Sequence, residues 1–368
     1  MPKVPVLRIR LLMTFCLAAA SAASPFLFGQ SSSSPSSSTP AAGQPASQTQ
    51  VPAGPQTQAP AQTPAQKNDS QSDQPVETLK ANVNVVGLFF NVKDKKGVLM
   101  PNLTKDDFDV LEDGKPQTIK YFSADSNLPL TLGILIDSSG SQRNVLDMEK
   151  EVGGAFLRQI LTDKDEAFVI DFNVDVSLAQ DFTRDSHRLQ KALNEVKINS
   201  GVSIMGGPVP TAGGANRGTL LYDAVYLSSH DMLAKEVGRK AMILLTDGDD
   251  QGSKLKLQDA IESAEKADAI VYVLLCADRG FYGGFYSGEG EMKKLTEQTG
   301  GRVINVGNKF DKLQEAFEQI AAELRSQYNL GYTPVNNKLD GTYRKLEIKS
   351  KQNYKIQARA GYYATPRD

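Results

Sequence analysis

Five oxygen-bearing side chains, two aspartates and three hydroxyl residues, could together hold a hard cation. They are Asp137, Ser139, Ser141, Thr219 and Asp247. The first three alternate along one short stretch, and the other two come from far along the chain. Carboxylate and hydroxyl oxygens suit Mg²⁺. Because Asp-Ser-Ser-Gly is also an ordinary strand-to-helix turn, the cation hypothesis depends on the two remote segments.

The elements around these residues would place all of them at one edge of a sheet. The runs 132–136 and 241–245 are apolar enough for buried strands, and Asp137 and Asp247 stand at their C-terminal ends. Thr219 begins a helix after a long glycine-rich loop, residues 199–218. Ligands of open α/β sheets bind at the carboxyl ends of the strands. We therefore expect a cation site at that edge.

Strands and helices alternate from Pro129 onward, which predicts an α/β unit over residues 129–327. The expected architecture is a doubly wound, mostly parallel sheet with helices on both faces. Apolar residues recur at helical spacing from Val145 to Ile160 and again from Phe310 to Leu324. Both segments are predicted to pack on the sheet.

The flanks of this unit have sequence patterns typical of β-strands instead. Residues 78–128 predict three strands, two of them joined by an Asp-Gly hairpin, and residues 328–368 predict three more. Without crossover helices, these strands cannot extend a parallel sheet. We expect the two flanks to form a small β-sandwich into which the α/β unit is inserted.

The N-terminal region predicts export. Residues 1–22 have a positive start, an apolar stretch and an A-x-A site, which is typical of a secretory signal peptide. Residues 23–77 are rich in Ser, Pro, Gln and Ala and predict a disordered linker. We expect a secreted, periplasmic or cell-surface protein with no membrane span in the mature chain. Whether the signal is cleaved or retained as an anchor stays open.

The segments ILIDSSGS, GTLLYDAV and ILLTDGDD resemble the three loops of the von Willebrand factor type A (VWA) domain and its metal-ion-dependent adhesion site. The resemblance covers about residues 130–327. The flanks resemble those of secreted VWA-related proteins known mainly from acidobacteria, in FNVKDKKG…LTKDDFDVLEDGKPQTI and in ELRSQYNLGYTP…RKLEIKS…ARAGYYA. The resemblance implies that the five oxygen-bearing residues are metal ligands and that the domain binds proteins without catalysing a reaction.

A site that mixes hydroxyls with carboxylates leaves its cation electrophilic if the neutral hydroxyls bind directly and the carboxylates act through water. An open position can then accept a carboxylate from a protein partner. We expect Mg²⁺, with Mn²⁺ or Ca²⁺ as alternatives.

Aromatic residues on one further loop could take part in recognition. Phe281, Tyr282, Phe285 and Tyr286 lie among glycines after the predicted strand AIVYVLLCAD, on the same sheet edge. They could form a partner-binding surface, because aromatic residues are enriched at binding hot spots. They could equally pack on the domain itself.

Two other functions compete with adhesion. One is an Mg²⁺-dependent hydrolase with Asp137 or Ser139 as nucleophile, although the sequence offers no matching general base or phosphate-binding lysine near the site. The other is a structural envelope protein with an unused metal site. The net charge of −2 argues against nucleic-acid binding, and two histidines leave little for zinc or triad chemistry. We expect no enzymatic activity.

Overall fold

The computed structural model describes residues 85–124, 128–199, 218–277 and 288–366. All of them belong to one compact unit, Glu77–Asp368. The predicted signal peptide and linker lie outside the described residues, as do Phe281, Tyr282, Phe285 and Tyr286. Among the helices that the structure describes, none is long and apolar enough to cross a membrane.

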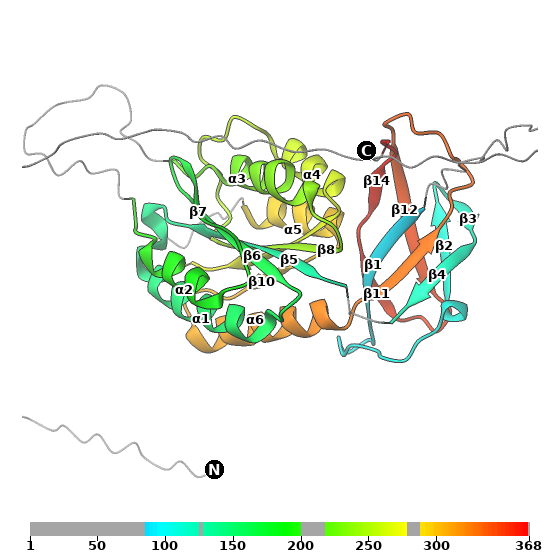
Figure 1. The fold of residues 1–368 in the computed structure, drawn as a ribbon, viewed down its shortest axis with the longest axis horizontal. Coiled ribbons are helices and arrows are strands. Elements are labelled where there is room, and N and C mark those ends of the chain that lie inside the picture. Colours follow the sequence, from blue (N-terminus) through cyan, green and yellow to red (C-terminus); the bar gives the residue numbers. More distant parts are fainter. Residues whose placement is uncertain (1–84, 125–127, 200–217, 278–287, 367–368) are drawn as a thin grey trace, which may run out of the picture. The chain divides into compact units, whose positions relative to one another are not determined.

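The α/β part is built on a six-stranded sheet (Figure 1). In spatial order its strands are β10 (Val303–Asn305), β9 (Ala269–Leu275), β8 (Arg239–Thr246), β5 (Leu130–Asp137), β6 (Glu166–Phe172) and β7 (Val176–Thr183). All neighbours pair in parallel except β7, which runs antiparallel to β6. The prediction of a mostly parallel sheet is confirmed.

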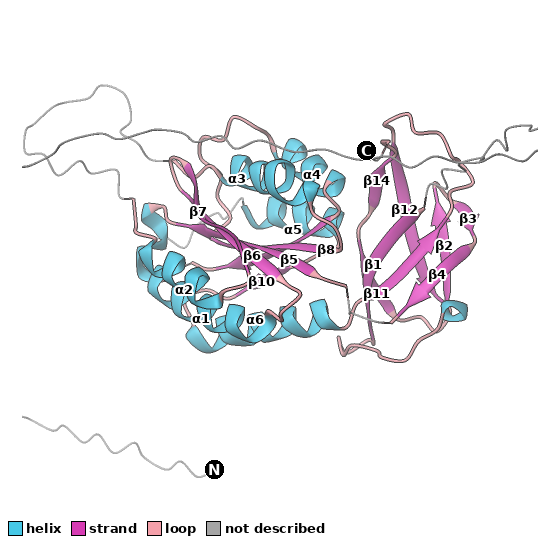
Figure 2. Ribbon diagram, viewed as in Figure 1, coloured by secondary structure: helices cyan, strands magenta, loops and turns pink. Residues whose placement is uncertain are grey.

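Helices cover both faces of this sheet (Figure 2). On one face lie α1 (Leu146–Ile160), α2 (Ser186–Glu195) and α6 (Phe310–Arg325), and on the other lie α3 (Leu221–Leu227), α4 (Leu257–Lys266) and α5 (Gly288–Thr299). Short helical turns complete this part: η2 (Gly140–Asn144), the π-helix η3 (Ser228–Met232) and η4 (Leu233–Lys235). The doubly wound arrangement predicted from the sequence is confirmed.

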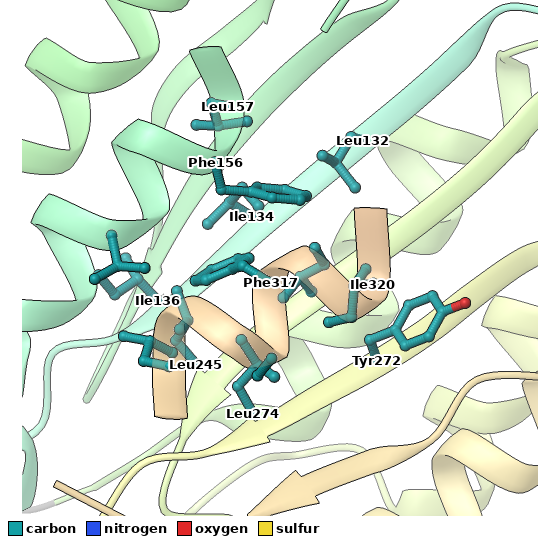
Figure 3. Packing of buried hydrophobic residues seen from close by; sticks show 14 of the residues in the cluster. Leu132, Ile134, Ile136, Phe156, Leu157, Leu245, Tyr272, Leu274, Phe317 and Ile320 are labelled. Atoms are coloured by element: carbon teal, nitrogen blue, oxygen red, sulfur yellow. The ribbon is translucent and has the colours of Figure 1, made fainter. Parts of the chain in front are cut away.

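The central strand β5 is buried at every position, because helices pack on both of its sides. Alternate residues serve opposite cores: Ile134 and Ile136 face α1 and α6, whereas Leu135 faces α3. Figure 3 shows Phe317 of α6 beside Phe156 of α1, with ring centroids 4.6 Å apart. This packing fixes the strand whose end carries Asp137.

The flanks form two four-stranded antiparallel sheets. One contains β13 (Lys355–Ala358), β1 (Val86–Lys93), β11 (Tyr328–Tyr332) and β4 (Ile119–Ser123), in that order. The other contains β14 (Gly361–Tyr363), β12 (Tyr343–Ser350), β2 (Phe108–Glu112) and β3 (Lys115–Gln117). Phe90 and Tyr328 of the first sheet pack against Phe108 of the second, so the two sheets share a core. The α/β part is therefore inserted in a β-sandwich, as expected.

The flanks hold more strands than the sequence predicted. Each contributes four strands instead of three, and a three-residue helical turn, η1 (Lys105–Asp107), precedes β2. The predicted turn is present, with both Asp113 and Gly114 at positive φ, but it joins β2 to β3. The strand of Ile119 and Tyr121, which was expected to complete the hairpin, lies in the other sheet. The chain then crosses to the other sheet as β4. In the same way, YKIQARAGYY is divided into β13 and β14, which belong to different sheets.

Candidate metal centre

The topology reverses between β5 and β8, which are neighbours in the sheet. The helix after β5 is α1, on one face, and the helix after β8 is α4, on the other. In sheets of this kind, the usual place for a ligand is outside the carboxyl ends of the two strands whose connections diverge in this way. Asp137 is the last residue of β5, and Asp247 directly follows β8.

Asp137 is completely buried and held on both carboxylate oxygens. The backbone N–H of Ser139 donates to Oδ1 at 2.9 Å, and the hydroxyl of Thr246 donates to Oδ2 at 2.8 Å. Further along the loop, the hydroxyls of Ser139 and Ser141 lie 2.9 Å apart. Three of the predicted residues are therefore adjacent on one loop, and Thr246 ties that loop to the neighbouring strand.

Asp247 lies half-buried in a tight turn. Its Oδ1 accepts from the backbone N–H of Asp249 at 3.2 Å. Gly248 has a φ of +90°, a conformation that side-chain-bearing residues rarely adopt, so this turn requires glycine. The turn directs the chain away from the strand immediately after Asp247.

Thr219 is buried and reaches the same edge from the second predicted loop. Its backbone pairs with Gln251, with hydrogen bonds of 3.0 and 2.9 Å, so the segment before α3 lies against the loop that carries Asp247. The helix begins two residues later, at Leu221, instead of at Thr219 itself. Backbone pairing thus brings the second and third predicted segments together.

The electrostatics of the site show a shortage of positive charge. Burial and, to a smaller extent, the charge of Asp247 raise the pKa of Asp137 to about 7, against the hydrogen bonds from Ser139 and Thr246 that lower it. Neither aspartate has an ion-pair partner among the described residues. In that part of the chain no group of three or more His, Cys, Asp or Glu side chains has metal-binding spacing. Two aspartates with neighbouring hydroxyls form a donor set of oxygen atoms, and such a set suits a hard divalent cation.

The sequence did not reveal the residues that hold these loops in place. Gln142 is fully buried, and its side-chain amide accepts from the Asp247 N–H at 2.9 Å and donates to the Cys276 carbonyl at 3.2 Å, in the orientation that satisfies both groups. The Ser138 hydroxyl donates to Asp171 and accepts from Asn173. A buried amide directly after a hydroxyl-rich loop is the signal that could have identified Gln142.

Other side chains that could carry chemistry have local structural roles, are exposed or are buried. Asp250 accepts from the Tyr222 N–H at 3.2 Å and from the Ser253 hydroxyl at 2.5 Å, so it fixes the start of α3. His187 and His230 are exposed on helical segments. Cys276 is fully buried.

No family model and no curated protein matches this chain. Solved structures do resemble it. The conserved hypothetical protein BatB from Bacteroides thetaiotaomicron is 18% identical, with a TM-score of 0.41 over 54% of this chain and 100% of that chain. The vWF domain of the type V pili tip protein Mfa5 from Porphyromonas gingivalis is 12% identical, with a TM-score of 0.40 over 53% of this chain and 94% of that chain.

A third similar structure is the proximal thread matrix protein 1 from the mussel byssus, with a zinc-occupied MIDAS motif. It is 17% identical, with a TM-score of 0.43 over 57% of this chain and 48% of that chain. At these identities and TM-scores, the similarities assign neither a family nor a function to this chain.

Proposed function

We propose that this protein is an exported binding module that holds a divalent cation, Mg²⁺ by preference, and uses it to bind a carboxylate of a protein partner. The ligands would be Asp137, Ser139, Ser141, Thr219 and Asp247. The observation that carries the proposal is the meeting of two aspartates without ion-pair partners at the ends of β5 and β8. The VWA resemblance of the three loops supports the same assignment.

Each group has a distinct part in this proposal. Ser139, Ser141 and Thr219 supply neutral oxygens, and the two aspartates supply negative charge. The bound cation would act as an electrophile toward an incoming acidic side chain. Because the hydroxyls add no charge, enough positive charge remains on the cation to attract a carboxylate from a partner.

Binding is favoured over hydrolysis by the state of Asp137. Both of its oxygens already accept hydrogen bonds, from the Ser139 N–H and the Thr246 hydroxyl. A nucleophile needs a free oxygen and a neighbouring base. Neither described histidine lies at the site, and Cys276 is buried with its pKa raised by burial.

Capture of a partner from native envelope extract would test this function. The wild-type protein is immobilised and exposed to the extract with Mg²⁺ or with EDTA, beside an Asp137→Ala variant. We expect a protein to be retained only by the wild type and only with Mg²⁺. Circular dichroism should show the variant folded. Retention that survives both EDTA and the substitution would exclude a cation-dependent mechanism.

A further inference from the structure

A third acid is buried close enough to Asp137 and Asp247 to be affected by their charges. Glu149 is in the first turn of α1 and is 0% exposed. Within the part of the chain that the structure describes, neither of its carboxylate oxygens accepts a hydrogen bond from an N–H or O–H group, and the Cys276 thiol is at most a weak donor to it. Burial of a carboxyl group without such bonds costs free energy. A side chain that only filled this space would be more stable as an apolar residue, so packing alone does not explain an acid here.

The surroundings of Glu149 connect it to the site. The Cys276 thiol, at the end of β9, is close enough to affect its pKa, and the Cys276 carbonyl is bound by Gln142, which also binds the Asp247 N–H. Burial is the largest influence and raises the pKa of Glu149 to about 8, while Cys276 lowers it and the charges of Asp137 and Asp247 raise it. The charges of Asp137 and Asp247 thus disfavour a charge on Glu149, whose side chain is closed off from water.

We propose that Glu149 strengthens cation binding through its charge, as a carboxyl group that lies behind the ligands and does not itself coordinate. This inference rests on the proposed function. The described residues contain no group of three acids with ligand spacing, so Glu149 acts at a distance. In a buried region, charges interact over longer distances than in water. A cation between Asp137 and Asp247 would turn the repulsion felt by Glu149 into attraction.

A role of Glu149 through its charge and a role in packing predict different effects of substitutions on cation binding. Removal of the charge weakens cation binding in the first case and leaves it unchanged in the second. Replacement by an apolar side chain of similar size removes a desolvated carboxyl group and should raise the melting temperature without metal. If Glu149 were needed for packing or for an unseen bond, the same change would lower that temperature.

The experiment compares the wild type with Glu149→Gln, Glu149→Met and a control, Glu265→Gln. Glu265 is also buried, at the C-terminal end of α4 and away from the candidate site. Mg²⁺ alone is titrated calorimetrically at about pH 8.5, where a group with a pKa near 8 is mostly ionised. Melting temperatures are measured in EDTA.

We expect both Glu149 variants to bind Mg²⁺ about tenfold more weakly than the wild type, the lower end of the range for residues behind metal ligands. Glu265→Gln should bind like the wild type, and Glu149→Met should melt at a higher temperature in EDTA. Wild-type affinity in both Glu149 variants would overturn this inference alone. Absence of Mg²⁺ binding by the wild type would remove the proposed function as well.

Discussion

Asp137 is held on two sides, by the Ser139 backbone and by the Thr246 hydroxyl. Thr246 is fully buried, and it also accepts the Gly248 N–H at 3.1 Å. A single hydroxyl therefore orients one candidate ligand and the turn that follows the other. At the scale of single residues, the shape of the site depends on side chains that do not belong to the proposed ligand set.

Thr246→Val should weaken the site while leaving the fold intact. The change keeps the shape of the side chain but removes its hydroxyl, so Asp137 and the Gly248 N–H each lose a partner. We expect the free energy of unfolding to fall by about 1–3 kcal/mol, the usual cost of an unsatisfied buried polar group. Mg²⁺ affinity should fall as well. Urea denaturation and calorimetry measure the two effects.

Thr131→Val is the matched control, because Thr131 is a buried threonine at the opposite end of β5. It should not alter Mg²⁺ affinity. Equal Mg²⁺ affinity in Thr246→Val and the wild type would mean that Asp137 needs no orientation by this hydroxyl.

Residue types and spacing predicted the candidate ligands, but not the residues that hold those ligands in position. Asp137 and Asp247 each follow an apolar run, and an acidic residue directly after such a run can be recognised in a sequence. Thr246 looks like an ordinary β-branched strand residue, and its bond to Asp137 spans 109 positions. Glu149 did leave a signal, since it is a charged residue four positions after Val145 on an apolar helical stripe. Its proximity to the site still depends on a tertiary contact with Cys276, the residue after β9.

At the scale of elements, the ring of Phe168 on β6 fills the space that a side chain at Gly133 of β5 would need. A Cβ atom added at Gly133 of β5 would lie 2.6 Å from the ring of Phe168 on β6. The absence of a side chain at this position lets the aromatic ring cross the face of the central strand. The strand that carries Asp137 is therefore positioned by a glycine as well as by the helices that cover it.

Gly133→Ala should destabilise the protein by about 1–3 kcal/mol, the usual cost of an overpacked core. The added methyl group must displace Phe168 or the strand itself. Gly140→Ala is the control, because a Cβ there meets nothing within 4 Å, and its effect should be much smaller. Urea midpoints for the two variants give the comparison, and equal midpoints would show that Phe168 moves aside at little cost.

The sequence predicted the presence of helices and strands better than it predicted which strands pair with one another. The apolar runs of β5, β8 and β9 and the stripes of α1 and α6 were visible because burial imposes a period on the sequence. The division of the last segment into β13 and β14, in two different sheets, was not visible. Alternation identifies a strand, but it does not indicate which of two sheets the strand joins.

At the scale of the whole chain, the inserted α/β part is tied to the sandwich by buried polar contacts. Glu323, in the last turn of α6, accepts from Lys93 of β1 at 2.9 Å and pairs with Arg302 at 2.7 Å. Glu265 of α4 accepts from the Tyr343 hydroxyl of β12 at 3.1 Å. These contacts make stability a property of both parts together, and they make it depend on pH.

Glu265 should make the protein less stable as pH rises. Burial raises its pKa to about 7, while Tyr343 and Arg359 lower it and Glu262 raises it. Because the folded-state pKa exceeds the unfolded one, the contribution of Glu265 is full below the unfolded value of about 4.5 and is lost as pH rises through about 7. Glu265→Gln should therefore gain stability relative to the wild type between about pH 5 and about pH 8.

Urea denaturation in EDTA at several pH values measures this difference. Asp137 and Glu149 titrate in both proteins, so the difference between wild type and variant isolates Glu265. A difference that stays constant across the range would mean that Glu265 has an ordinary pKa.

The location of a bound cation tests the central claim most directly. Crystals grown with Mn²⁺ would reveal the metal through its anomalous scattering. We predict one strong peak at the carboxyl ends of β5 and β8, surrounded by Asp137, Ser139, Ser141, Thr219 and Asp247, and no such peak in Asp137→Ala. Absence of a peak there at saturating Mn²⁺ in the wild type, or a peak only elsewhere on the protein, would contradict the account.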